Sequence, residues 1–224
     1  TPDNKPFQGD PRTVLQRNLE IAASMGYTYY VSPELEYFYS QDPTSAVGLD
    51  TSGYFDQSSN YQGTDLRRET VLTLEELGIP VESSHHEAAP SQHEIDLRHT
   101  DALTMADSVM TYKLVVKEIA MQHGLYASFM PKPVAEITGN GMHTHMSLFQ
   151  GDKNVFYSED DESHLSETAK QFSAGLMKHA REITSVTNQW VNSYKRLVPS
   201  YEAPSYVTWS EVNRSDLIRI PSFM

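Results

Sequence analysis

The pattern of apolar and polar positions predicts four helices along the chain. Asp10-Pro11 is typical of a helix start, and Leu15, Leu19 and Ala22 then recur on one face until Gly26. Three further helices are expected, over residues 64–77, 100–123 and about 165–186. Thr64 would cap the first of these three. The helix expected over residues 100–123 should pack on a sheet through an apolar stripe made of Ala106, Val109, Met110, Val116, Ile119 and Ala120. No apolar run approaches the roughly 18 residues that cross a bilayer, so no membrane association is expected.

Alternation of polar and apolar residues predicts four strands between these helices. Residues 27–39 place Ser32, Glu34, Glu36 and Phe38 on one side and Tyr29, Val31, Leu35 and Tyr37 on the other. Two strands are expected over residues 79–87 and 94–99, and a fourth over 142–149. Residues 41–62 are expected to form a surface excursion with a hairpin around Gly53. The fold class is therefore predicted as α+β, a curved and mainly antiparallel sheet with flanking helices.

Charged residues crowd into one stretch, His85-His86-Glu87 to His93-Glu94. Strand alternation would send His85 and Glu87 to one face, and would send Glu94, Asp96 and Arg98 to one face. Carboxylates held so close repel each other unless a cation or a proton intervenes. A solvated loop explains clustered charge as well. The stretch thus predicts either an ion-binding site or a solvated loop.

Two other segments bear on this choice. Glu34 and Glu36 point the same way from one strand, as in a site or on a solvated edge strand. His143 and His145 share a strand face directly after the Gly139-Asn140-Gly141 turn, whose glycines allow close approach to a phosphate-bearing ligand. Two imidazoles in register favour a site over a structural role.

Residues 195–204 are predicted to form a lid. Glu202 lies between Pro199 and Pro204, and these prolines restrict the backbone and favour an ordered loop over a strand. Residues 212–221 then end the chain with Arg214 and Arg219, in a protein with few arginines.

Composition narrows the classes of protein. The 224 residues include no cysteine, so a disulfide framework and a thiolate metal site are excluded, and a cytoplasmic location is expected. The net charge of -13 and a pI near 5.0 argue against a nucleic-acid surface.

Five motifs resemble, in the same order, the catalytic domain of type I glutamine synthetase. They are Ser32 to Phe38, His85 to Glu94, Lys132-Pro133 to His143, Val198 to Pro204 and Asn213 to Pro221. The resemblance implies the glutamine synthetase/guanido kinase-like fold. It implies that residues 1–224 form part of one catalytic domain, with no second domain in this chain. The family's N-terminal β-grasp domain and the C-terminal portion would be missing, so these residues alone are expected to be inactive.

The resemblance implies two divalent ions, Mg²⁺ or Mn²⁺. Glu36, Glu87 and Glu94 would hold the first ion, and Glu34 and His143 the second. Oxygen ligands with one imidazole also suit these hard ions on chemical grounds.

The resemblance also assigns substrate contacts. Those for glutamate and ammonia would be Gly139, Arg196, Glu202 and Arg214, and those for ATP would be His145, Ser147 and Arg219; Glu202, Arg214 and Arg219 would be catalytic. ATP would convert glutamate to γ-glutamyl phosphate, from which ammonia displaces phosphate beneath the lid. The partners implied are glutamate, ammonia and ATP, in a homo-oligomer of two stacked six-membered rings.

Three positions depart from the family pattern. Thr138, Asn140 and Ser200 stand where asparagine, serine and glycine are usual. They leave open a γ-glutamyl ligase for another amine, such as methylamine, a polyamine or ethanolamine. Outside the family, a metallohydrolase could use the same His and Glu cluster, and a non-enzymatic metal-binding module would need neither the glycine turn nor the lid.

Overall fold

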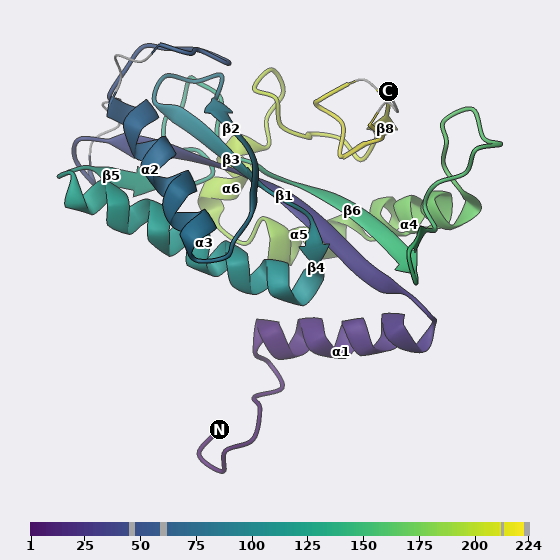
Figure 1. Cartoon of the computed structure of the whole chain (residues 1–224). Coiled ribbons are helices and arrows are strands. Elements are labelled where there is room, and N and C mark those ends of the chain that lie inside the picture. The colour runs from purple at the N-terminus through teal and green to yellow at the C-terminus, as the bar shows by residue number, and fades with distance from the viewer. Residues whose placement is uncertain (45–47, 59–61, 212, 222–224) are drawn as a thin grey trace.

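Strand β1 (Thr28–Ser40) is the centre of the sheet because both of its edges are paired (Figure 1). Along one edge lie β6 (Met142–Gln150) and β5 (Tyr126–Ser128), and along the other lie β3 (Gln92–Leu97) and β4 (Thr100–Asp101). β2 (Val81–His86) extends the sheet beyond β3, and β7 (Lys153–Asn154) extends it beyond β6. All of these pairs are antiparallel, as predicted. The interpretation of β1 as a solvated edge strand is wrong.

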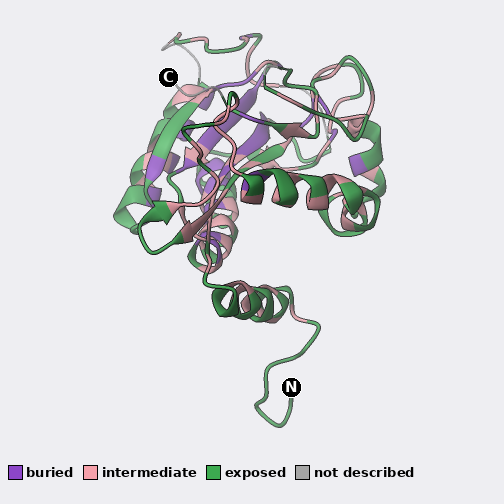
Figure 2. Ribbon diagram, turned by 90° about the vertical axis from the view of Figure 1, so that its right-hand side faces the viewer, coloured by how far each residue is buried: buried purple, intermediate pink, exposed green. Residues whose placement is uncertain are grey.

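The computed structural model describes residues 1–44, 48–58, 62–211 and 213–221. In these ranges α2 (Gln62–Glu76) and α3 (Ala102–Gln122) cover one face of the sheet. Leu35, Tyr37 and Tyr39 of β1 are buried there with the core side chains of the two helices. Burial is concentrated in the sheet and on the helix sides that meet it (Figure 2). A register shift of one residue would exchange the two faces, so this core fixes which face carries Glu34 and Glu36.

Helix α1 (Pro11–Ser24) begins and ends as predicted. Asp10 caps it, since its carboxylate accepts a hydrogen bond of 3.0 Å from the Thr13 N–H, and Gly26 follows with φ of 86°. The helix buries no residue. Arg12 contacts Asp107 of α3 through two bonds of 2.9 Å, which ties α1 to the rest of the domain.

Two predicted helix starts are displaced. α2 begins at Gln62, so Thr64 is not its cap. α3 begins at Ala102, because Thr100–Asp101 pair with β1 and the Asp101 side chain caps the helix through the Thr104 N–H at 3.0 Å. Neither helix is long and apolar enough to span a membrane, and the same is true of every other helix in the described ranges.

The stripe predicted for α3 is partly wrong. Met110 is 71% exposed, whereas Met105 and Tyr112 are buried against the sheet. The Tyr112 hydroxyl donates to the Leu35 carbonyl at 3.2 Å, which gives this large side chain a polar partner within the core.

The single helix expected at 165–186 is two helices, α4 (Glu167–Lys178) and α5 (Ala180–Thr187). The break falls at His179, whose ψ of 10° leaves the helical region, and Gly175 lowers the helix propensity of the preceding turn. α6 (Val191–Arg196) follows, and β8 (Trp209–Ser210) and β9 (Ile218–Arg219) form a separate parallel pair.

The hairpin expected around Gly53 is not formed within residues 48–58. The Gly53 carbonyl accepts from the Asp56 N–H at 3.0 Å, which closes a turn and pairs no strands. Residues 45–47 and 59–61 of this predicted excursion lie outside the described residues, as do Val212 and residues 222–224 near the end of the chain.

Candidate active site

Carboxylates from three strands meet on the sheet face opposite α2 and α3. On β1 and β3, Glu34 lies directly opposite Asp96, and Glu36 lies opposite Glu94. Such pairs place Cβ atoms about 4.5–5.5 Å apart. Glu87 follows β2 on the far side of β3, and its negative charge helps to raise the pKa of both Glu36 and Glu94. The five acidic side chains therefore form one patch.

Two imidazoles of β6 face this patch. His143 Nδ1 lies 3.5 Å from Glu34 Oε2 and 3.6 Å from Glu36 Oε1, and His145 Nε2 lies 2.5 Å from Glu34 Oε1. Burial pushes the pKa of Glu34 up, but its hydrogen bonds with both imidazoles hold that pKa well below the ordinary range. Glu34 is thus an ionised carboxylate, and its nearest ligand atoms, with those of Glu94 and His143, lie within 4.8 Å of one another.

His85 belongs to the same patch, although the sequence analysis assigns it no individual role. Its Nε2 lies 3.0 Å from Glu87 and 3.6 Å from Glu94. Its ring stacks on Phe55, with centroids 4.4 Å apart and planes at 9°. The surface excursion, to which no chemistry was assigned, therefore supplies a wall of the site. Nothing in the local sequence pattern signals this contact.

Glu94 and Asp96 lie too close to the other acidic groups of the patch for all of them to be ionised without a proton or a cation between them. Burial, followed by the charges of Asp96, Glu36 and Glu87, raises the pKa of Glu94 to about 10. Burial raises the pKa of Asp96 as well. Asp96 Oδ2 accepts from the Ser83 hydroxyl, and Asp96 also shares a hydrogen bond with Glu94. Carboxylates as crowded as these need a proton or a cation between them, and a hard divalent ion fits this need.

Glu36 is fixed by the turn that precedes β6. Its Oε2 accepts from Gln92 Nε2 at 2.9 Å and from the Gly141 N–H at 3.0 Å, and the residue is only 6% exposed. Gln92 Nε2 also donates to the Gly139 carbonyl at 3.1 Å. Gln92 thus joins a metal-ligand candidate to the glycine turn, a link that depends on strand pairing and was missed in the sequence.

The glycines of this turn are required by what packs against them. A Cβ at Gly139 would lie 2.2 Å from the Pro131 carbonyl oxygen, and a Cβ at Gly141 would lie 2.6 Å from Arg196 Nη2. Burial lowers the pKa of Arg196, and the charge of Glu36 opposes that change. Gly139, Gly141 and Arg196 therefore form one close-packed unit beside Glu36.

We expect Gly139→Ala to displace this turn and to lower the free energy of unfolding by about 1–3 kcal/mol, the usual cost of overpacking. The clash is with backbone, which cannot rotate away. Urea unfolding would measure the change. Gly53→Ala is the matched control, because a Cβ there meets nothing within 4 Å. Equal stability of the two variants would contradict the close packing at Gly139.

The predicted lid has a constrained backbone. Ser200 and Glu202 have φ values of 77° and 53°, in the left-handed region that side chains other than glycine rarely adopt. Ala203 is buried and Glu202 is exposed. A cavity of about 240 Å³ lies between the lid and two segments that follow it, residues 205–208 and 213–216.

The two arginines near the end of the chain reach different parts of the site. Arg214 Nη1 donates to the Tyr54 hydroxyl at 3.1 Å, and this bond raises the pKa of Arg214, with further contributions from the charges of Glu202 and Glu87. Glu34 raises the pKa of His145, and the charge of Arg219 opposes it. Ser147 lies two residues beyond His145 on the same face, opposite Tyr30.

The raised pKa of Glu94 makes stability depend on pH. The folded chain binds a proton there that the unfolded chain releases above the ordinary value of 4.5, so stability should fall as pH rises from about 5 toward 9. Each 1 kcal/mol lost should lower Tm by about 2–4 °C in a chain of this size. We expect Mg²⁺ to replace the proton, so that it raises Tm more at pH 9 than at pH 6. Thermal unfolding in EDTA and in Mg²⁺, at pH 6 and pH 9, measures both effects. A Tm that does not change with pH would contradict the prediction.

Comparison with known proteins identifies the family. A model of "Glutamine synthetase, catalytic domain" matches residues 8–224. Glutamine synthetases of Mycolicibacterium smegmatis and Thermotoga maritima are 53% and 51% identical over 99% of this chain, which covers 51% of each relative. The chain thus spans about half the length of these curated relatives.

Comparison with solved structures points to the same family. A Plasmodium falciparum glutamine synthetase superposes with a TM-score of 0.87 at 30% identity, over 97% of this chain and 49% of that one. A structure described as a GmaS/ADP complex also gives 0.87, at 35% identity over 98% and 53% of the two chains. The curled antiparallel sheet with flanking helices is therefore confirmed, and the chain belongs to the family of glutamine synthetase catalytic domains.

Proposed function

We propose that the protein containing these residues forms glutamine from glutamate and ammonia, with ATP, through γ-glutamyl phosphate. The observation that carries the proposal is the patch of Glu34, Glu36, Glu87, Glu94 and Asp96, beside the close-packed Gly139 turn and Arg196. A carboxylate is a poor electrophile, so ligation needs a site that holds a nucleotide, an amino acid and divalent ions together. The named relatives support this activity for the longer protein.

The donor set suits two Mg²⁺ or Mn²⁺ ions. In this proposal Glu36, Glu87 and Glu94 hold one ion, and Glu34 and His143 hold the other. Bound ions would offset negative charge on the nucleotide phosphates. Support comes from the raised pKa of Glu94, to which the neighbouring charges of Asp96, Glu36 and Glu87 contribute after burial.

The remaining residues bind and orient the substrates. Gly139 and Arg196 hold glutamate, and His145, Ser147 and Arg219 hold the nucleotide. Arg214 and Arg219 offset charge on the phosphoryl group in transfer. Glu202 binds ammonium and takes up its proton beneath the lid. The proximity of Arg214 to both Glu202 and Glu87 supports a single reaction centre.

A γ-glutamyl ligase that uses another amine is the second candidate function, because Thr138, Asn140 and Ser200 depart from the family pattern. Asn140 bears little on this choice. Its Nδ2 donates to the Ser128 and Met130 carbonyls at 3.2 and 3.0 Å, and its Oδ1 accepts from Gln92 at 3.1 Å. Its amide is thus engaged within the fold. Thr138 and Ser200 are then the departures that leave the substrate open.

The test is phosphate release and amide formation by the full-length protein with glutamate, MgATP and one amine at a time. Ammonia, methylamine, ethanolamine and a polyamine should be compared. Glutamine synthesis requires ammonia to give the largest kcat/KM. Phosphate release without any amine would indicate a hydrolase, and no release at all would indicate a binding module.

We also propose that the full-length protein is cytoplasmic and assembles from two stacked six-membered rings, with residues 1–224 as part of one catalytic domain. The proposal rests on family membership. Sedimentation of the 224-residue chain beside the full-length protein tests it, and full activity from a monomer of the short chain would overturn it.

A further inference from the structure

Lys132 is a buried cation to which the proposed reaction gives no task. The residue is only 5% exposed, although lysine is rarely buried unless it is paired. Within the described ranges no carboxylate oxygen lies within 4.0 Å of its Nζ. Other contacts must therefore hold the ammonium in place.

Two contacts do so, and they lead to different parts of the site. Nζ donates to the Ile137 carbonyl at 2.5 Å, at the start of the turn that contains Gly139. Nζ also lies 3.9 Å from the centre of the Tyr201 ring, in the lid. A cation over an aromatic face is attracted most strongly where water is excluded, as it is here. One ammonium thus bridges the glycine turn and the lid.

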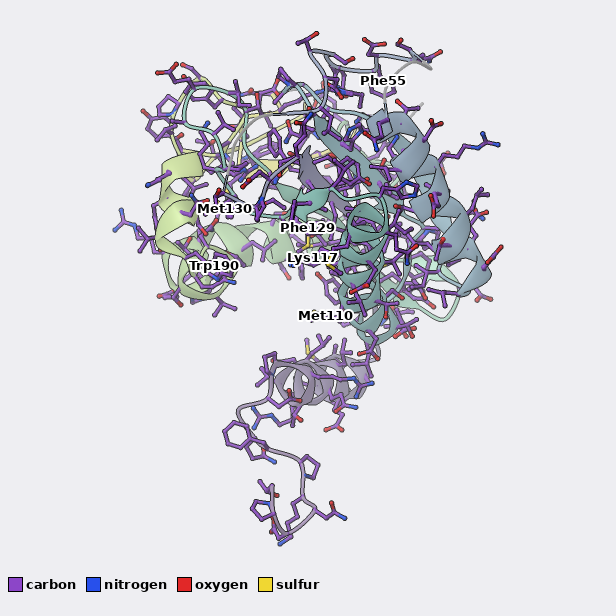
Figure 3. The ribbon with its side chains drawn as sticks, turned by 90° about the vertical axis from the view of Figure 1, so that its left-hand side faces the viewer. Phe55, Met110, Lys117, Phe129, Met130 and Trp190 are labelled. Atoms are coloured by element: carbon purple, nitrogen blue, oxygen red, sulfur yellow. The ribbon has the colours of Figure 1, made fainter. Side chains whose placement is uncertain are left out.

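The backbone of Lys132 is held rigidly. Its N–H donates to Asn192 Oδ1 at 2.6 Å, and Asn192 Nδ2 donates to its carbonyl at 2.9 Å, which ties the segment to α6. In Figure 3, Met130 and Trp190 mark where this segment lies next to the start of α6. The Pro131 carbonyl also accepts from the Asn140 N–H at 2.8 Å. The lid is therefore the movable partner of the bridge.

The lid needs such a contact to keep this conformation. Ser200 and Glu202, on either side of Tyr201, both have positive φ. Non-glycine residues in that region are disfavoured and persist only where surrounding contacts hold them. Tyr201 is the residue between them, and its ring meets the fixed ammonium.

We propose that Lys132 is a positioning residue that holds the lid closed through Tyr201 while it fixes the Gly139 turn. The inference rests on the proposed function, in which the lid protects γ-glutamyl phosphate from water. Lys132 need not touch a reacting atom. Its removal should open the lid and let phosphate leave without an amide being formed.

The test compares Lys132→Met, Tyr201→Leu and the double variant of the full-length protein. Two quantities are measured, the ratio of phosphate released to glutamine formed and the amide hydrogen exchange of residues 198–204. Each single variant should raise the ratio well above one and speed exchange about tenfold, which corresponds to 1.4 kcal/mol of lid closure. The double variant should be no worse than Lys132→Met, because Tyr201→Leu removes only a contact that Lys132→Met already removes.

Matched variants separate this role from a general loss of structure. Lys178→Met removes an exposed lysine at the end of α4, outside the lid, and should change neither quantity. Tyr201→Phe keeps the ring and should behave as the unchanged protein, and Lys132→Arg should restore much of the coupling. If Lys132→Met fails to fold, Tyr201→Leu alone decides, because it leaves the Ile137 contact in place.

Independent effects that multiply in the double variant would overturn the proposal, as would unchanged exchange in Tyr201→Leu. If the protein without substitutions makes no glutamine, the proposed function is refuted instead. The exchange measurement would then still decide whether Lys132 holds the lid.

Discussion

Glu36→Ala is expected to abolish glutamine formation. The substitution removes one of the three carboxylates proposed for the first ion, and it leaves Gln92 Nε2 and the Gly141 N–H without their shared acceptor. Loss of an outer partner of a metal ligand already costs about 10–100-fold, so loss of a ligand should reduce turnover by at least about 100-fold. Steady-state turnover and Mn²⁺ binding, followed by electron paramagnetic resonance, would measure the effect.

Glu36→Gln separates the two causes. Glutamine keeps an oxygen acceptor for the Gly141 N–H but removes the charge, so this variant should fold normally and still bind Mn²⁺ weakly. Glu118→Ala, at an exposed position of α3, is the control for loss of one acidic residue. Full Mn²⁺ affinity in Glu36→Gln would contradict the assignment of Glu36 as a ligand.

The sheet and the faces of its strands could be predicted because alternation is a local property. Leu35 and Tyr37 alternate with Glu34 and Glu36, and burial of the apolar pair under α2 and α3 fixes the orientation of the acidic pair. The same argument placed His143 and His145 on one face of β6. The break at His179 was missed because apolar spacing continues across it, while the backbone does not.

Other parts of the site depend on contacts between distant segments. Phe55 meets His85, Gln92 links Glu36 to Gly139, and Lys132 meets Tyr201. A local sequence pattern does not show any of these contacts, because each one joins segments that are far apart in the chain. Asp96 is an intermediate case, since alternation put it on the face of Glu94, but only the pairing with Glu34 showed how crowded its carboxylate is.

The second large effect is expected from Glu202→Ala. Glu202 is exposed in the lid, and its charge acts on Arg214, so it can meet ammonium without contributing to the buried ion site. Removal of a general base typically costs 10²–10⁴-fold, and amide formation should fall by about 100-fold or more. ATP affinity should stay within about threefold, because the residues proposed for the nucleotide, His145, Ser147 and Arg219, belong to β6 and β9 and not to the lid.

The ratio of products tests the role of Glu202 most directly. Without a carboxylate to deprotonate ammonium, γ-glutamyl phosphate should be consumed by water, and phosphate released should exceed glutamine formed. Glu202→Gly shows whether the φ of 53° contributes, since glycine adopts it without strain, and Glu159→Ala in an exposed loop controls for charge. If Glu202→Ala lost ATP affinity as severely as Glu36→Ala loses turnover, Glu202 would belong to the nucleotide site and the lid assignment would be wrong.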